Sequence, residues 1–209
     1  MEGADVLEQR ASTSVPLYAF YKATMLTTVQ QITSDEDFQT FVDCYNREIG
    51  HKVLSLDFVK NAIVYLFRDQ DGTPVGGYTI NTEQAYRVLS YLPAELAAGI
   101  RALTVGHDTY ELGTIWVSSE QRHGRTKLEV WLHIFENMIA RAGCIMAGGT
   151  FSDEIYSFYA RYGMKLLYKH TVTLADGSSV PQYVIYCDDI YATKIPEMSA
   201  LLRKRLERE

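Results

Sequence analysis

The sequence is poor in cysteine and has no long apolar run, and both shortages narrow the class of protein. Its three cysteines, Cys44, Cys144 and Cys187, lie far apart among 209 residues. An odd, widely spaced set fits reduced thiols and excludes a disulfide framework or a closely spaced zinc site, so we expect no metal. No apolar stretch approaches the roughly 20 residues that cross a bilayer, so we expect no membrane partner.

Basic residues are also few relative to acidic ones. The chain contains 20 Lys and Arg against 26 Asp and Glu, which gives a formal net charge of −6. Neutralising nucleic-acid phosphates requires a clustered basic surface, so we expect no nucleic-acid partner. The first residues include Glu2, Asp5 and Glu8 in place of a basic segment followed by an apolar one. We therefore expect no secretory signal and a cytoplasmic location.

The composition is that of an ordinary folded protein, with 47% hydrophobic and 22% charged residues. The length fits one compact core. We expect a lead-in segment without clear periodicity at residues 1–22, a single domain at residues 23–192, and a charged terminal helix at residues 193–209.

The apolar pattern predicts strands that alternate with helices along the chain. Hairpins at both ends of this order, the first around the turn at residues 69–74, predict an α/β fold with a mixed, largely antiparallel central sheet flanked by helices. The expected strands are residues 23–32, 61–68, 75–80, 110–117, 144–150, 165–174 and 180–187. The expected helices are one that begins at Ser34, short pieces within 83–105, a long amphipathic helix ending near Gly143, one from Ser152 to Gly163, and residues 195–209.

The polar corner at residues 118–125, between a strand and the long helix, predicts an anion site. Backbone N–H groups at a helix start lack partners, and together with the helix dipole they suit a pyrophosphate. Residues 121–126, Gln-Arg-His-Gly-Arg-Thr, resemble the Gln/Arg-x-x-Gly-x-Gly/Ala signature by which GNAT N-acetyltransferases hold the pyrophosphate of coenzyme A. Thr126 stands where Gly or Ala is usual, and Arg122 could take the place of Gln121. Plain helix capping is the alternative.

Two further segments resemble the same family in the order that the family shows. Residues 111–117 and the Ser-Ser-Glu-Gln that follows look like its fourth strand. Residues 152–164 are similar to its Asn-x-x-Ala-x-x-Phe-Tyr-x-x-x-Gly-Phe segment, with Ser, Ile and Met in place of Asn, Ala and Phe and one residue fewer before Gly163. The resemblance covers residues 61–174 and implies a GNAT-like acyl-CoA N-acyltransferase fold.

The resemblance also implies a reaction. In this family an amine attacks the thioester directly within a ternary complex, so the enzyme positions both groups and moves the protons. We therefore expect an N-acyltransferase, foremost an N-acetyltransferase, with acetyl-CoA or another acyl-CoA as co-substrate and a small-molecule amine as acceptor. A homodimer stays open.

Two residues are candidates for proton transfer by resemblance. Tyr159 occupies the Tyr of the Phe-Tyr pair, where a phenol can donate to the departing thiolate. An aromatic core role is the alternative, and Tyr156 and Tyr162 are competitors on neighbouring helical faces. Glu111 is the candidate base, directly or through a water, with a surface or sheet-edge carboxylate as the alternative.

The cofactor contacts implied by resemblance follow the strand and the polar corner. Backbone groups of Ile115 and Val117 would pair with the pantetheine arm, and Arg122 and Arg125 would supply permanent charge to the pyrophosphate. For His123 a solvated loop position is the alternative. The full set of expected cofactor-binding residues is Ile115, Trp116, Val117, Gln121, Arg122, His123, Gly124, Arg125, Thr126 and Ser152.

Residues 86–93 between the third and fourth strands look like the extra segment of the GNAT-like N-acyl amino acid and acyl-homoserine-lactone synthases. Those relatives use long acyl chains, often on acyl carrier protein, which could dock on a basic surface of Arg122, Arg125 and Lys127. The alternative is that the segment only covers the sheet. A catalytically inactive GNAT-like binding module is a third hypothesis, favoured by Thr126.

Overall fold

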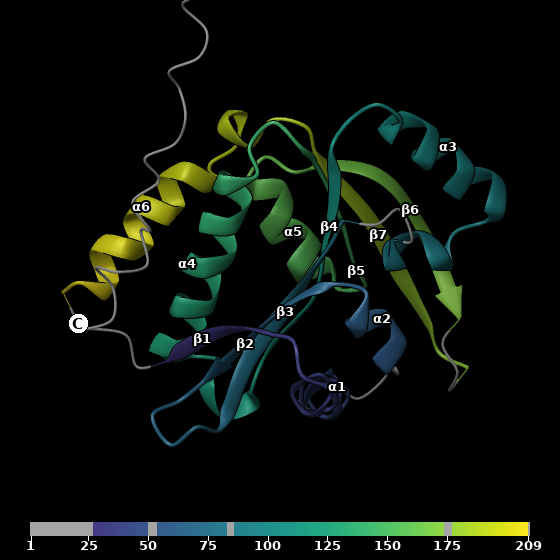
Figure 1. The fold of residues 1–209 in the computed structure, drawn as a ribbon. Coiled ribbons are helices and arrows are strands. Elements are labelled where there is room, and N and C mark those ends of the chain that lie inside the picture. The colour runs from purple at the N-terminus through teal and green to yellow at the C-terminus, as the bar shows by residue number, and fades with distance from the viewer. Residues whose placement is uncertain (1–26, 50–53, 83–85, 174–176, 209) are drawn as a thin grey trace, which may run out of the picture.

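Figure 1 shows the computed structural model of the chain, which describes residues 27–49, 54–82, 86–173 and 177–208. The expected lead-in at residues 1–22 and the first part of the strand expected at 23–32 lie outside these residues. Residues 83–85 of the expected helical insertion and Leu174 at the end of an expected strand also lie outside them.

The centre of the fold is a seven-stranded sheet in the order β1-β2-β3-β4-β5-β7-β6. Neighbouring strands are antiparallel except for β4 and β5, which are parallel. The expectation of a mixed, largely antiparallel sheet is therefore confirmed. The strands are β1 (Thr28–Ile32), β2 (Ile63–Arg68), β3 (Pro74–Asn81), β4 (Thr109–Val117), β5 (Ile145–Thr150), β6 (Lys165–Thr173) and β7 (Ser179–Cys187).

Helices fill the connections between strands. The insertion between β3 and β4 contains a 3-10 helix and an α-helix, which confirms the short helical pieces expected there, whereas α2 was not expected. The α-helices are α1 (Asp35–Ile49), α2 (Leu56–Lys60), α3 (Ala94–Thr104), α4 (Arg125–Ala140), α5 (Asp153–Arg161) and α6 (Ile195–Leu206). The 3-10 helices are η2 (Arg87–Tyr91), η3 (Ser119–Gln121) and η4 (Ile190–Ala192).

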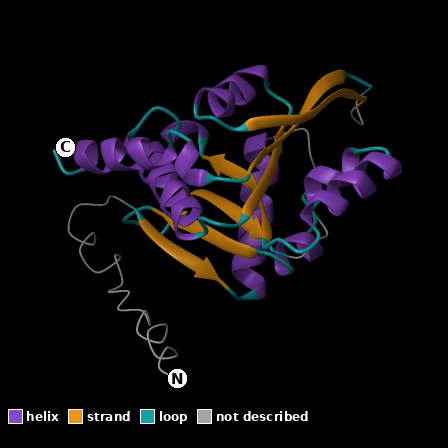
Figure 2. Ribbon diagram, turned by 90° about the horizontal axis from the view of Figure 1, so that it is seen from above, coloured by secondary structure: helices purple, strands orange, loops and turns teal. Residues whose placement is uncertain are grey.

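Each face of the sheet has its own apolar core. In β2, Val64 and Leu66 pack with α1, whereas Phe67 belongs to the core that includes Val130 and Ile134 of α4. Successive side chains of a strand point to opposite faces, which explains this division. Figure 1 accordingly shows α1 and α2 on one face and α4 and α6 on the other, and Figure 2 shows helices on both sides of the sheet. The apolar stripe expected for the long helix is confirmed.

Local signals fix the helix starts better than the helix ends. Ser34 caps α1 as expected, since its Oγ accepts the N–H of Asp37 at 3.1 Å. The long helix α4 ends at Ala140, three residues before the expected Gly143. Its last turn tightens, because the N–H of Arg141 bonds the carbonyl of Met138 at 3.2 Å, and Gly143 then takes φ 98° in the turn into β5.

The terminal helix α6 packs along α4. Its first and last residues, Ile195 and Leu206, are buried, and Arg203 bonds Glu136 of α4 at 2.5 Å. The charged helix expected at the end of the sequence therefore has one side built into the core that α4 covers.

Candidate active site

The site begins where the two parallel strands of the sheet diverge. β4 and β5 pair only through Thr109–Ile145, Tyr110–Met146 and Glu111–Ala147. On its other edge β4 stays paired with β3 as far as Val117. Beyond Glu111, the β5-facing edge of β4 has no strand partner among the described residues. Its peptide groups can therefore pair with an extended ligand arm.

A groove occupies the space between the diverging strands. Its volume is about 250 Å³, and we call it the main groove. α1, β4 and the segment from β5 into α5 form its walls. It is lined by Tyr45, Ile49, Leu112, Gly113, Thr114, Ile115, Gly149, Thr150, Phe151, Ser152, Ile155 and Tyr159.

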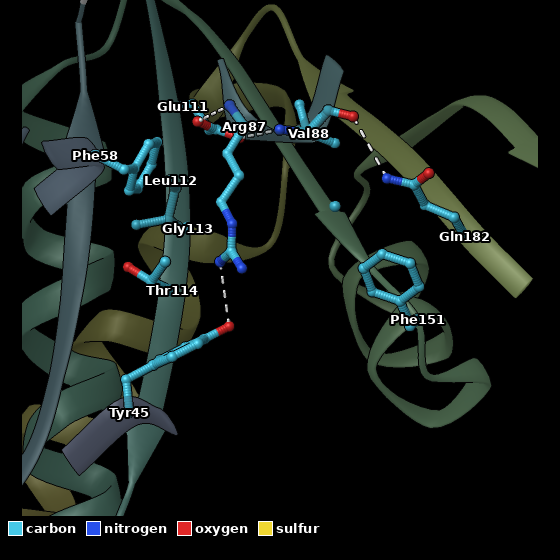
Figure 3. A pocket seen from close by; sticks show the side chains of 11 residues that line it. Tyr45, Phe58, Arg87, Val88, Glu111, Leu112, Gly113, Thr114, Phe151 and Gln182 are labelled. Atoms are coloured by element: carbon cyan, nitrogen blue, oxygen red, sulfur yellow. Dashed lines mark hydrogen bonds between the residues drawn. The ribbon is translucent and has the colours of Figure 1, made fainter. Parts of the chain in front are cut away.

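A second, smaller cavity of about 70 Å³ adjoins the main groove and is shown in Figure 3. The two spaces share Tyr45, Leu112, Gly113, Thr114, Gly149 and Phe151. The small cavity adds Phe58 of α2, Arg87 and Val88 of η2, Glu111 of β4 and Gln182 of β7. The two spaces are therefore one continuous site with a wide arm and a narrow end.

A β-bulge in β4 shapes the junction of the two spaces. Thr79 pairs with Gly113 and Gly77 with Trp116, so β4 has one residue more than β3 across this step. The bulge holds Thr114 at φ 45°, a left-handed conformation that a β-branched residue rarely adopts. The Thr114 hydroxyl donates to Oγ1 of Thr79 at 2.7 Å. Strain of this kind costs roughly 1 to 3 kcal/mol and gathers at functional sites.

Glu111 lies in the wall of the small cavity and is only 4% exposed. Its Oε2 accepts the backbone N–H of Arg87 at 2.8 Å, and its Oε1 accepts that of Val88 at 2.6 Å. Burial raises the pKa of this carboxyl above its usual value, although the two amide bonds oppose the change. β4 is a central strand, so the sheet-edge alternative for Glu111 is wrong.

Tyr159 lines the main groove from α5 and is 9% exposed. Burial raises the pKa of its phenol, which stays protonated at neutral pH. The residues of the groove include neither competitor. Tyr156 stacks on Tyr183 with ring centroids 4.3 Å apart, and Tyr162 packs against Phe158 at 4.5 Å. The geometry thus favours Tyr159 among the three.

Other expected site residues divide between the groove and its surroundings. Ile115 and Ser152 both line the main groove, and Ser152 also caps α5 by accepting the N–H of Ile155 at 3.3 Å. The side chain of Trp116 is 2% exposed and packs edge-on against Phe41 of α1, with centroids 6.1 Å apart. The Trp116 side chain thus faces away from the main groove, because alternation along β4 turns it to the opposite face, and only the Trp116 backbone remains as an expected cofactor contact.

The polar corner after β4 keeps the form expected of an anion site. Gly124 precedes the first turn of α4 and no side chain caps that turn. Thr126 is buried, and its hydroxyl donates to Oε1 of Gln121 at 3.2 Å. The side chain of Thr126 therefore points back toward the corner, where Gln121 holds its hydroxyl. His123 is exposed, as the alternative of a solvated loop histidine predicts.

The two arginines of the corner have different surroundings. Arg122 is half-exposed and donates to the backbone carbonyl of Glu48 at 3.1 Å, which ties the corner to the end of α1. Arg125 donates to the buried carboxylate of Glu129 at 3.1 Å and to the carbonyl of Leu206 at 2.9 Å. The expectation that the Arg125 side chain binds pyrophosphate is thus wrong, because a buried carboxylate one turn along α4 holds it.

Sequence reasoning missed Tyr45, Phe151 and the guanidinium of Arg87, which all lie in the site. For Tyr45 and Phe151 the sequence has no signal beyond apolarity. Arg87 is the one charged residue within the apolar run of residues 86–92, which was a usable signal.

Two negative findings, on metal-binding clusters and on membrane-spanning helices, apply only to the part of the chain that the structure describes. Within it, no three or more His, Cys, Asp or Glu side chains gather closely enough to hold a metal ion. No helix among the same residues has the length and apolarity to span a bilayer.

Comparisons with known proteins identify the fold. No protein-family model and no curated protein matches the sequence. Arabidopsis thaliana Naa50, solved with a bisubstrate analogue, aligns with a TM-score of 0.56 at 12% identity over 78% of this chain and 99% of its own. A GNAT superfamily phosphinothricin acetyltransferase from Sinorhizobium meliloti, solved with acetyl-CoA, aligns at 0.53 and 12% identity over 79% and 89%.

An N-acetyltransferase from Staphylococcus aureus Mu50 aligns with a TM-score of 0.52 at 12% identity, over 78% of this chain and 98% of its own. Identities this low support a shared fold and leave the reaction to be argued from the site. The chain has the fold of the GNAT superfamily of N-acetyltransferases.

Proposed function

We propose that the protein is an acyl-CoA-dependent N-acyltransferase, foremost an N-acetyltransferase, that acylates a small primary amine. The observation on which this rests is the continuous site between β4 and β5. Tyr159 lines its wide arm and Glu111 its narrow end, and the chain runs on from β4 through the polar corner into the uncapped start of α4.

The residues of the site fit coenzyme A. The unpaired edge of β4 beyond Glu111 suits the amides of a pantetheine arm, and Ile115 lies on the wall beside it. The free N–H groups at the start of α4 suit a pyrophosphate, with the exposed Arg122 nearby. When bound, the acyl-CoA supplies the thioester whose acyl group is transferred.

Glu111 is suited to hold the amine and to accept its proton. The two carboxylate oxygens have about four lone pairs between them, and the backbone N–H groups of Arg87 and Val88 and the Asn81 side chain use three of these, so the carboxylate can accept one more hydrogen bond. The raised pKa makes it a stronger base than an ordinary carboxylate. Once deprotonated, directly or through a water, the amine nitrogen attacks the thioester carbon, the C–N bond forms and the C–S bond breaks.

Tyr159 is suited to the opposite task on the other side of the junction. Its phenol is protonated at neutral pH, so it can donate to the thiolate that leaves. Solvent then restores the proton. The bulge at Thr114 lies between the two residues, where both spaces meet, and we place the thioester there.

The long-chain alternative gains no support from the insertion. Its apolar residues Val88, Leu89 and Leu92 are buried in their own cluster against Val184 of β7. They fill that space themselves, which agrees with the alternative that the insertion covers the sheet.

Thermal shift and acyl transfer test the proposal together. Coenzyme A and acetyl-CoA should each raise the melting temperature more than ADP does, because ligands that bind the native state stabilise it by mass action. Gly124→Val should weaken this shift, since a bulky side chain would stand before the helix start. A Cβ at Gly124 lies 3.6 Å from the nearest atom, so Gly124→Ala is a control that should fold and bind normally.

Transfer is then measured by mass spectrometry on a panel of small amines. An acylated amine product supports the proposal. A shift without any product would favour a binding module, a shift only with a long-chain acyl-CoA would favour the synthase alternative, and no shift at all would contradict the proposal.

A further inference from the structure

We propose that the small cavity binds the acceptor, and that the acceptor is a compact primary amine with a carboxylate, held by Arg87 while its amine faces Glu111. This inference rests on the proposed N-acyl transfer and names the class of its acceptor. It follows from how the cavity arranges one cationic and one anionic side chain.

The guanidinium of Arg87 is held in a fixed orientation at the cavity wall. Its Nη1 donates to the phenol oxygen of Tyr45 at 3.3 Å. Its Cζ lies 5.6 Å from the centroid of the Tyr45 ring and 5.9 Å from that of Phe58. Two aromatic rings from α1 and α2 thus orient the cation. A guanidinium is planar and has five N–H donors, so a guanidinium held in this way can give two parallel hydrogen bonds to a carboxylate.

Arg87 and Glu111 share the cavity without forming a simple ion pair. The carboxylate accepts the backbone N–H groups of Arg87 and Val88, whereas the guanidinium reaches to Tyr45. Figure 3 shows the Arg87 side chain extending from the Glu111 end of the cavity toward Tyr45. The negative and positive groups therefore lie apart along one wall. A ligand with an ammonium at one end and a carboxylate at the other complements both charges.

The rest of the lining limits the size and polarity of the acceptor. The cavity measures about 70 Å³, and Phe58 and Phe151 supply apolar surface. Gln182, 1% exposed, is engaged with the carbonyl of Val88 at 3.4 Å and with His170 at 2.5 Å. This space suits a small amino acid or ω-amino acid and excludes a folded protein surface.

Close packing of the insertion on β5 makes the arrangement stiff. A Cβ added at Gly149 would lie 2.5 Å from Cγ2 of Val88, so the glycine allows η2 to approach the strand. η2 begins at Arg87, and the first two backbone N–H groups of η2 donate to the carboxylate of Glu111. The insertion thereby sets the position of both charged groups, which gives it a role in acceptor binding beyond covering the sheet.

Matched acceptor pairs test the inference. Each pair compares an amine with and without its carboxylate: 4-aminobutanoate with propylamine, and alanine with ethylamine. The quantity measured is the ratio of kcat/KM for the two members, in the wild type and in Arg87→Gln. Comparing the ratio between proteins cancels the intrinsic reactivity of each amine. Arg87→Lys keeps the charge without the fork, and Arg101→Gln removes an exposed arginine of α3 as a control.

In the wild type at least one carboxylate-bearing member should bind through Arg87. The ratio for that pair should fall by about 10- to 100-fold in Arg87→Gln, mainly through KM, as expected for loss of a charge-assisted hydrogen-bond pair. It should fall less in Arg87→Lys and stay unchanged in Arg101→Gln. Coenzyme A binding should be normal in all variants. Equal ratios in the wild type and Arg87→Gln for both pairs would overturn the inference while leaving N-acyl transfer intact.

A binding measurement separates this inference from the proposed reaction. Thermal shift by 4-aminobutanoate and alanine, with coenzyme A present, does not require turnover. A shift in the wild type that disappears in Arg87→Gln supports the acceptor site even if no acyl group is transferred. The absence of a wild-type shift together with the absence of any acylated product from these amino acids contradicts it.

Discussion

The replacement Tyr159→Phe isolates the proposed acid, because it removes a single oxygen from a side chain that lines the main groove. The ring itself packs edge-on against Phe158, with centroids 5.8 Å apart, and belongs to the core beneath α4. The phenylalanine ring fills the same space, so no cavity forms. We expect the free energy of unfolding to change by less than about 1 kcal/mol.

The effect on turnover should be much larger than the effect on stability. A positioned acid typically contributes about 10²- to 10⁴-fold to a rate. We therefore expect kcat to fall by about 10²- to 10³-fold, with the affinity for acetyl-CoA unchanged. Because burial raises the pKa of Tyr159, ionisation of this phenol should not reduce the wild-type rate up to pH 10.

Release of the coenzyme A thiol reports kcat, and isothermal titration reports acetyl-CoA affinity. Tyr156→Phe and Tyr162→Phe are matched controls, because both residues flank Tyr159 on the same segment and lie outside the groove. A Tyr159→Phe enzyme with a kcat within about threefold of wild type would refute the acid assignment. So would a large loss in Tyr156→Phe alone.

Three further predictions concern Glu111, Gly149 and His133. Glu111→Gln should lower kcat/KM by at least about 10²-fold at pH 7, while coenzyme A still binds. In the wild type, the acid limb of the pH profile of kcat/KM should lie above the ordinary glutamate pKa. A wild-type rate in the variant would exclude Glu111 as the base. Gly149→Ala should lower the free energy of unfolding, measured in urea, by about 1 to 3 kcal/mol and should raise the KM for the acceptor, because the added Cβ would lie 2.5 Å from Val88. Unchanged values of both quantities would contradict the packing argument. Burial lowers the pKa of His133 from 6.5 to about 4. Below pH 6.5 the unfolded chain therefore takes up a proton that the folded chain does not. The free energy of unfolding should fall by roughly 3 kcal/mol as the pH falls to 4. The urea midpoint should decrease less between pH 7 and pH 4.5 in His133→Asn than in the wild type or in His123→Asn, a control at an exposed histidine. Equal decreases in all three proteins would contradict the role of His133.

The local signals of the sequence were sufficient to predict most of the secondary structure. Ser34 and Ser152 cap their helices because each precedes an apolar helical pattern and offers an oxygen to an unpaired N–H. The apolar, β-branched and aromatic run of β2 and the turn residues after it predicted the hairpin. The end of α4 was predicted less well, since tightening of the last turn depends on how the chain enters β5.

The site was predicted where a motif follows the chain and was missed where the site joins distant segments. Tyr159, Ile115 and Ser152 line the main groove and Glu111 lines the small cavity, because the strand and helix that position them are local features. The side chain of Arg125 was assigned wrongly, and the sequence did not show that the Trp116 side chain turns away from the main groove. No short window of sequence contains the contacts that decide these two features. One is the face of a bulged strand that a residue occupies, and the other is whether a buried carboxylate lies one turn away.

By itself, the sequence determined the order of the elements, the mixed sheet and the polar corner at the start of α4, because these depend on periodicity, capping and turn chemistry within short segments. Only the tertiary structure decided that β4 and β5 diverge after Glu111 and that Thr114 bulges into the gap. It alone placed Arg87 between rings from α1 and α2, opposite Phe151 and Gln182. The physical reason is that a binding cavity consists of side chains brought together by packing across the sheet, and their separation along the chain has no relation to their distance in space.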